Sequence, residues 1–388
     1  MIDIDIPPLE SRMRTYFDES IDWDQLKTSG HKLTRNAARY DAKNVRAKVL
    51  RMENYNTSKI LRFTVRPFDV RWCYYSPTRP LWNEPRPTLW KHVFPGNKYL
   101  VSRLKASKTI GSSPMLFSTT LIDRQVISVN PSAIPMRLSV TPNDQDLTGL
   151  EYTANLSPGS RSYLLSLGFS DLDTDQQVTE LIWYHALAIG YSPAYLTENA
   201  DGIHQDWPRI VLPNSMDLLI ASAALGQQVA ALLDTEVDVL GVTIGKIRDE
   251  LNTIAVFQCV DGKPAKPEAG DLDVTAGWGH AGKDGITMPG RGKLIHHDNG
   301  SYDVYLNENT YWQNLPEMVW NYNIGGYQVI KKWLSYREKS LFGRGLTPIE
   351  VRYVTGIARR LATLVVLQSQ LDINYSQIKS STYTWQHN

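Results

Sequence analysis

The stretch RPFDVRWCYY, residues 66 to 75, holds two arginines, four aromatic residues and one aspartate in ten positions. Aromatic and β-branched residues favour strands. Similar segments recur through residues 60 to 140, separated by turns rich in proline and glycine. We therefore predict a β-rich region, whose strands are ILRFTV, DVRWCYY, KYLVSRL, PMLFSTTLI and IPMRLSV.

Helical signals lie on both sides of this region. Residues 41 to 52 (DAKNVRAKVLRM) and 214 to 233 (NSMDLLIASAALGQQVAALL) have the apolar spacing of helices. Another helix is expected to begin at Asp173, which we interpret as its N-cap. Gln176 follows three residues later and would complete a capping box.

The C-terminal part is predicted to contain two helices. GGYQVIKKWLSYREK, residues 325 to 339, forms the first. The second has Thr347 as N-cap, Pro348 at its first position and Glu350 at its third. Five apolar side chains of the second helix form a heptad-like seam, interrupted at Gln368. They are Val354, Ile357, Leu361, Leu364 and Leu371.

These elements predict an α/β fold of the mixed α+β kind. It has a β-rich N-terminal recognition part, a helical middle and a C-terminal helix pair. The length corresponds to about two to three domains. We place them at residues 1–145 (basic and β-rich), 146–320 (mixed α/β with two apolar helices) and 321–388 (a helical spacer or docking segment).

The composition is that of an ordinary globular protein, 42% hydrophobic and 21% charged. No uninterrupted run of 18 apolar residues occurs, and the N-terminus lacks the basic and apolar regions of a secretory signal. Two cysteines are too few for a disulfide framework or a structural zinc site. We expect a cytoplasmic protein without a membrane partner.

The net charge of +1 conceals a strong asymmetry. Residues 51 to 110 contain twelve lysines or arginines and three acidic residues, a surplus of +9, whereas residues 141 to 206 carry −9. Such a surplus cannot be neutralised by neighbours in the sequence, and a folded surface that keeps it suffers repulsion. Arginines interleaved with rings suit phosphates and base edges. The predicted partner is a polyanion, DNA first.

No catalytic constellation is visible. The glycine-rich segment 277–282 matches G-x-G-x-x-G, but it lacks the preceding strand and following helix of a dinucleotide site. His296 and His297 would point to opposite faces of a strand, which disfavours joint metal ligation. We interpret His185 as a core histidine on a helix. We therefore expect no catalysis by this chain alone.

Taken together, several segments resemble the target-recognition region of type ISP and related type IIG single-polypeptide restriction–modification enzymes. RPFDVRWCYY, followed by EPRPTLW and NKYLVSRL, is similar to the entry into that region. Further motifs follow in the family's order and extend the likeness over roughly residues 30 to 372. They are IWYHALAIGYSPAYLTENADGIHQDWPRIVLP, ALGQQVAALL, VWNYNIGGYQVIKKWLSYRE and LTPIEVRYVTGIARRLATL.

The resemblance implies sequence-specific binding of double-stranded DNA in phage defence. In that family the chain runs from a nuclease through a helicase-like motor and an adenine-N6 methyltransferase to the recognition domain. This sequence resembles the last part alone, so no cofactor is expected in it. S-adenosylmethionine is expected in the associated methyltransferase domain or subunit. The apolar seam would dock against that partner.

The resemblance also implies where DNA is contacted. Arg66 and Arg71 are expected to anchor the strand pair and the DNA backbone. Trp82 and Trp90 would mark the tips of a loop that enters a groove or the gap left by an extruded adenine. The further candidate DNA-facing side chains are Tyr75, Arg79, Arg86, Asn97, Lys98 and Arg103. An RNA- or single-strand-binding module that stacks bases on the same rings is the alternative.

Overall fold

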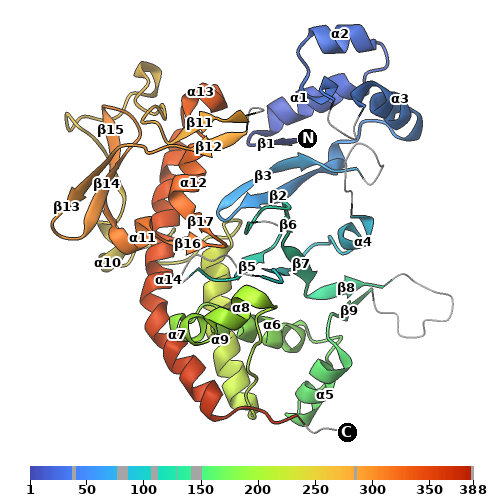
Figure 1. The fold of residues 1–388 in the computed structure, drawn as a ribbon, viewed down its shortest axis with the longest axis vertical. Helices are drawn as coiled ribbons and strands as arrows, with labels where there is room; N and C mark the ends of the chain where they lie inside the picture. The colour runs from blue at the N-terminus through green and yellow to red at the C-terminus, as the bar shows by residue number, and fades with distance from the viewer. Residues whose placement is uncertain are drawn as a thin grey trace.

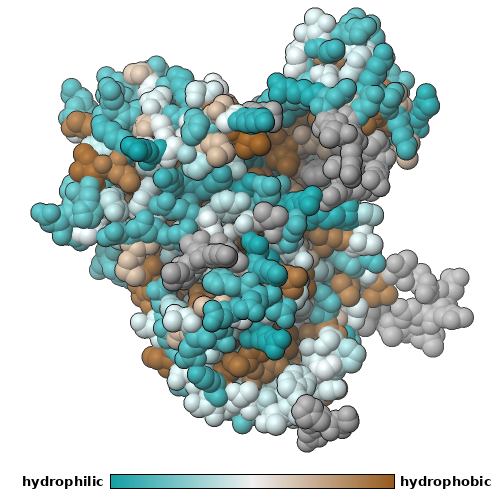
Figure 2. All heavy atoms as spheres, viewed as in Figure 1, coloured by the Kyte–Doolittle hydropathy of each residue, from teal (hydrophilic) through white to brown (hydrophobic). Residues whose placement is uncertain are grey.

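The computed structural model combines helices with several small sheets, and the long helix α14 (Pro348–Ser380) runs along much of the molecule (Figure 1). The predicted mixed α/β class is confirmed. Figure 2 shows an indentation between the lobe of the N-terminal helices and the lobe that contains β13 to β15. The structure describes residues 1–36, 41–76, 86–105, 112–128, 130–140, 151–283 and 286–385.

The first fifty residues fold largely as a small helical unit. It consists of α1 (Ile6–Phe17), α2 (Trp23–Thr28) and α3 (Ala42–Met52). Leu9, Met13 and Val49 are fully buried and share a core with Tyr74. The helix predicted from residues 41 to 52 is confirmed as α3. Its first turn is capped by Asp41, whose carboxylate accepts a hydrogen bond from a backbone N–H.

The stretch at residues 66 to 75 lies in an antiparallel hairpin, as predicted. Its strands are β2 (Ile60–Arg66) and β3 (Asp69–Tyr74). The turn passes through Phe68, whose φ is 59°. A left-handed backbone is unusual for phenylalanine, and burial of the ring in the main core offsets its cost. The sheet has the order β1-β3-β2-β6, with β1 (Ile2–Asp3) and β6 (Leu121–Ile122) at its edges.

Two small sheets follow along the chain. The first has the order β5-β4-β7, from β4 (Tyr99–Ser102), β5 (Met115–Ser118) and β7 (Ser132–Pro135). The second pairs β8 (Arg137–Ser139) with β9 (Tyr152–Ala154), and the short helix α4 (Pro87–Trp90) precedes β4. The strands expected in KYLVSRL, PMLFSTTLI and IPMRLSV are therefore present.

The centre of the fold is helical. α6 (Gln176–Gly190) crosses α9 (Met216–Leu233), and α14 packs on both. The crossing is so close that a Cβ atom at Gly226 would lie 1.8 Å from the carbonyl oxygen of Tyr184. Three shorter helices accompany this core, namely α5 (Pro158–Ser166), α7 (Pro193–Glu198) and α8 (Ala200–Gln205).

Length and composition alone would let α9 cross a membrane. Its packing is that of a core helix, because 44% of it is buried within the chain and it lies against α6, α14 and β5. We therefore attribute the apolar sequence of α9 to its packing in this core.

The capping predictions had different outcomes at the two long helices. Thr347 and Glu350 form the expected capping box at the start of α14. The cap predicted for α6 is wrong, because Asp175 accepts the hydrogen bonds from the first turn. Asp173 instead accepts hydrogen bonds from Arg161, 2.6 Å away, and from a backbone N–H of β9. The carboxylate of Asp173 therefore forms an ion pair with Arg161 instead of capping α6.

The apolar seam of α14 is used inside this chain. Its five side chains are at most 2% exposed, and α14 packs against α9, α11 and α7. The expectation that this seam docks on another part of the parent enzyme is therefore wrong. The pattern identified a buried helix face but not what covers it.

The histidine on α6 has the core role that we predicted. His185 is fully buried, and both ring nitrogens are bonded, Nδ1 to the hydroxyl of Ser222 at 2.8 Å and Nε2 to the carbonyl oxygen of Val211 at 2.7 Å. Burial lowers the pKa of His185 to about 4. The ring is neutral above about pH 4. Its two hydrogen bonds link α6 to α9 and to the loop that precedes α9.

A second lobe follows α9. Its main sheet has the order β10-β15-β14-β13, with all pairs antiparallel. The strands are β10 (Val256–Cys259), β13 (Leu294–His297), β14 (Ser301–Tyr305) and β15 (Thr310–Pro316), and α10 (Asp249–Asn252) and α11 (Glu317–Trp320) flank them. The glycine-rich segment pairs as β11 (Gly279–Ala281) with β12 (Thr287–Pro289), without the strand-to-helix turn of a dinucleotide site.

The helix predicted for residues 325 to 339 is shorter in the structure. β16 (Asn323–Ile324) and β17 (Tyr327–Gln328) form a hairpin, and α12 (Val329–Ser335) begins only after it. Gly325 and Gly326 take positive φ values of 57° and 87° at the hairpin turn, where other residues would be strained. α13 (Lys339–Phe342) then leads toward α14.

The predicted domain boundaries at residues 145 and 320 stay a prediction. The largest buried core includes Phe68, Leu187 and Leu371, so it draws on all three predicted segments.

Candidate nucleic-acid interface

Many cations of the basic segment are paired within the fold. The described pairs are Lys59–Glu53, Arg62–Glu236, Arg66–Asp123, Arg71–Asp69 and Lys98–Glu180. Several acidic partners come from segments far along the chain, and Glu180 belongs to the acidic stretch itself. The positive surplus of residues 51 to 110 therefore does not form an equally large free surface. Cations and carboxylates that are far apart in the sequence lie close together in the fold.

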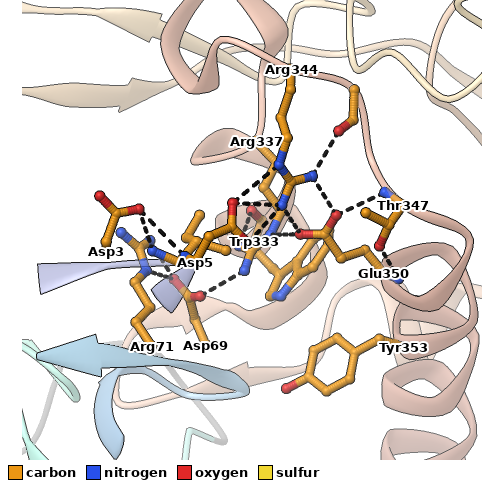
Figure 3. Close-up of polar contacts among 12 residues, drawn as sticks. Asp3, Asp5, Asp69, Arg71, Trp333, Arg337, Arg344, Thr347, Glu350 and Tyr353 are labelled. Atoms are coloured by element: carbon orange, nitrogen blue, oxygen red, sulfur yellow. Dashed lines mark hydrogen bonds and ion pairs between the residues drawn. The ribbon is translucent and has the colours of Figure 1, made fainter. Parts of the chain in front are cut away.

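Asp69 is the centre of a buried ionic network, shown in Figure 3. Its carboxylate accepts hydrogen bonds from Arg71 Nε at 3.0 Å and Arg337 Nη2 at 3.0 Å. Burial alone would raise the pKa of Asp69, but the two guanidinium groups outweigh it and hold that pKa well below its usual range. The network continues through Glu350 to Arg344 and joins β3 to the start of α14.

Arg66 lies at the end of β2 and is 9% exposed. Its guanidinium pairs with Asp123 at 2.9 Å and donates to the side-chain oxygen of Gln125 at 3.2 Å. It also lies 5.3 Å from the ring centre of Tyr327. Arg66 and Arg71 thus do anchor the strand pair. That they also contact DNA stays a prediction.

Three other predicted DNA-facing side chains have internal partners. Asn97 is 3% exposed, and its amide bonds to backbone groups of His92, Lys98 and Arg137. Lys98 Nζ lies 2.6 Å from Glu180 and 2.9 Å from the hydroxyl of Tyr184. Tyr75 is buried and stacks on Trp90. These contacts give all three side chains a structural role in the fold. That they also contact DNA stays a prediction.

Trp90 also differs from the expectation of an inserting loop tip. It is half-buried in α4 and stacks on Phe63 as well as on Tyr75. The ring is therefore packed against the β2–β3 hairpin. Trp82 and Arg79 lie outside the described residues.

Some cations of the same region have no carboxylate partner among the residues that the structure describes. Arg86 begins α4 with a φ of 45° and is half-buried, and Arg103 follows β4. Burial lowers the pKa of Arg103, and its Nε atom has no hydrogen-bond partner among the residues that the structure describes. Exposed cations nearby in the sequence are Arg51, Lys91 and Lys105.

Sequence reasoning missed the contribution of the C-terminal part to this region. Lys332 on α12 places its Nζ 4.6 Å from the ring centre of Tyr336, and the guanidinium of Arg71 lies 4.5 Å from the same ring. The signal was present, since residues 327 to 337 repeat the mixture of rings and cations found at residues 66 to 75. Helical periodicity alone does not show that these side chains meet the β2–β3 hairpin.

The chemistry of this arrangement is that of anion binding. Among the residues that the structure describes, no group of three or more His, Cys, Asp or Glu side chains could hold a metal ion. The cations offer donors suited to phosphate, and the half-buried setting strengthens their field.

A sequence profile described as the type ISP C-terminal specificity domain matches residues 1–349. The chain belongs to this family. The match to the type ISP specificity domain spans the β2–β3 hairpin and extends to the start of α14. A search of curated protein sequences gave no significant match.

Solved structures share the fold of this specificity domain. The type ISP restriction–modification enzyme LlaBIII bound to DNA has 15% identity and a TM-score of 0.57 over 96% of this chain. A nuclease-deletion mutant of the type ISP enzyme LlaGI with a DNA substrate mimic has 16% identity and a TM-score of 0.54 over 94%. A DrdV–DNA complex has 18% identity and a TM-score of 0.53 over 94%. This chain covers only 22%, 30% and 32% of those three chains.

Proposed function

We propose that the chain recognises a specific sequence in double-stranded DNA and presents it to an adenine-N6 methyltransferase of the same restriction–modification system. The observation that carries this proposal is membership of the type ISP specificity family, which has the fold of enzymes solved on DNA. The parent enzyme or a partner subunit would supply S-adenosylmethionine chemistry, and this chain would supply the choice of site.

The charge distribution supports backbone contacts by the unpaired cations. Arg86 and Arg103 retain donors that no described residue uses, and Lys91 and Lys105 are exposed beside them in the sequence. Phosphate contacts of this kind fix the register of a protein on duplex DNA, while base contacts select the sequence.

The alternative of single-strand or RNA binding has lost its main support. A stacking platform needs ring faces that are open to bases. Phe63, Phe68, Tyr74 and Tyr99 are at most 4% exposed, and Tyr75 is covered by Trp90. The rings of the basic segment that the structure describes therefore mostly build the fold.

Duplex binding should show the salt dependence of a phosphate-contacting protein. About five to six contacts give a slope near −5 for the logarithm of the binding constant against the logarithm of salt concentration. Arg86→Ala and Arg103→Ala should each weaken binding about tenfold and make the slope shallower by about 0.9. Fluorescence anisotropy with labelled duplexes measures both quantities.

Arg209→Ala is the matched control, because Arg209 is 89% exposed at its side chain and lies outside the basic segment, three residues after the acidic one. It should leave the slope unchanged. Wild-type affinity that does not respond to salt, or that is greater for single strands, would count against the proposal.

Presentation to a methyltransferase can be tested by grafting. We expect that replacing the specificity domain of a type ISP enzyme with this chain moves adenine methylation to a new sequence. Sequencing of modified DNA identifies the methylated sites. Methylation that remains at the recipient enzyme's own site would show that this chain does not choose the target.

A further inference from the structure

We propose that Lys332, Arg66 and Arg71 form a receptor for one phosphate group of the DNA backbone. This inference rests on the proposed function and adds a contact made by the C-terminal part of the chain. The receptor lies where α12 meets the β2–β3 hairpin.

The geometry brings three cations to two rings. Lys332 Nζ lies 4.6 Å from the ring centre of Tyr336 and 5.7 Å from that of Tyr327. Arg66 lies 5.9 Å and 5.3 Å from the same two rings, and Arg71 lies 4.5 Å from Tyr336. The two rings help to hold the three cations together, because a ring face attracts positive charge.

The local charges do not balance. Arg66 has Asp123, and Asp69 serves both Arg71 and Arg337. The side-chain amine of Lys332 forms no ion pair or hydrogen bond with any residue that the structure describes. The three cations Lys332, Arg66 and Arg71 therefore face two carboxylates, one of which also pairs with Arg337, in a half-buried place where repulsion is poorly screened.

The pKa of Lys332 agrees with a place that accepts an anion. Burial, followed by repulsion from Arg66 and Arg71, lowers the pKa of Lys332 to about 8, although Asp69 acts in the opposite direction. A lysine that served only to stabilise the fold would be expected beside a carboxylate. A bound phosphate would supply the missing negative charge and stabilise the protonated amine.

Two guanidinium nitrogens of this group have no hydrogen-bond partner among the described residues. Besides the amine of Lys332, Arg66 Nε is buried and has no hydrogen-bond partner among the described residues. Arg71 directs Nε and Nη2 to Asp69, which leaves Nη1 without a described partner. A compact ammonium beside two guanidinium groups suits a phosphate better than a base edge, which requires one planar fork.

The test uses the 388-residue chain, duplex DNA and three variants. Lys332→Ala should weaken binding about tenfold on every duplex, whatever its sequence, and make the salt slope shallower by about 0.9. Lys332→Arg should keep the slope. Lys331→Ala removes the adjacent lysine of α12, which has no described ring contact, and should have a smaller effect on both quantities. Circular dichroism confirms that each variant is folded.

The failures can be told apart. Unchanged affinity and slope for Lys332→Ala, while Arg86→Ala still weakens binding, overturn the receptor but leave the proposed function standing. No duplex binding by the wild-type chain overturns both. A thermal shift with inorganic phosphate that Lys332→Ala abolishes, together with unchanged DNA affinity, assigns the site to free phosphate and overturns the DNA source.

A pH series gives a second readout. Because the amine of the free protein loses its proton near pH 8, wild-type affinity should fall by up to about tenfold from pH 7 to pH 9. Arg66, Arg71, Asp69 and Tyr336 face Lys332. The pKa of Asp69 lies well below its usual range and those of Arg71 and Tyr336 are raised, so these three groups do not titrate in this interval. Lys332→Arg should remove the fall, since arginine stays protonated. An equal fall in both proteins would contradict the receptor.

Discussion

Replacing Asp69 with asparagine is expected to lower the free energy of unfolding by about 3–5 kcal/mol. The substitution keeps the shape of the side chain but leaves Arg71 without a carboxylate and Arg337 with only its 4.0 Å contact to Glu350. Both guanidinium groups are at most 15% exposed at their side chains, so water cannot replace the carboxylate. Urea unfolding followed by circular dichroism measures the loss.

Glu198→Gln is the matched control, because the pair of Glu198 with Lys379 is about half exposed. It should change the free energy of unfolding by less than about 1 kcal/mol. A similar small effect of Asp69→Asn would show that the buried network does not stabilise the fold.

The carboxylate of Asp69 should also make the free energy of unfolding depend on pH in the acid range. The folded-state pKa of Asp69 lies well below the ordinary value, so the unfolded chain binds a proton more readily. The stabilisation is therefore complete above about pH 4 and is lost as the pH falls below it. In Asp69→Asn this part of the acid dependence should be missing.

Gly226→Ala is expected to destabilise the fold by about 3 kcal/mol or more. The added methyl group would lie 1.8 Å from the carbonyl oxygen of Tyr184 and 2.5 Å from its carbon. Both are backbone atoms, so no side-chain rotation can relieve the contact, and α6 would have to move away from α9. Thermal unfolding of the purified variant measures the effect.

Gly356→Ala is the control for this substitution. Gly356 lies within α14, and a Cβ there would meet only the methyl group of Thr243 at 3.7 Å, an ordinary contact. Alanine should therefore stabilise the helix by about 0.5–1 kcal/mol. If Gly226→Ala were as harmless as Gly356→Ala, the close crossing of α6 and α9 would be incorrect.

Local patterns in the sequence determined most of the elements. Aromatic and β-branched content identified the strands β2 and β3, and Thr347 followed by Pro348 and Glu350 identified the start of α14. The order of short motifs identified the family. Propensity, capping and periodicity depend on residues that are close together in the sequence, so they can be recognised without the tertiary structure.

Only the tertiary structure decided how the charges and the apolar faces are used. Asp173 caps nothing because Arg161 reaches it, and Lys98 meets Glu180 from the segment of opposite charge. The seam of α14 is covered by helices of the same chain, while Lys332 joins a hairpin more than 250 residues earlier without gaining a carboxylate. Coulomb forces and burial depend on distance in space, and a single sequence does not contain those distances.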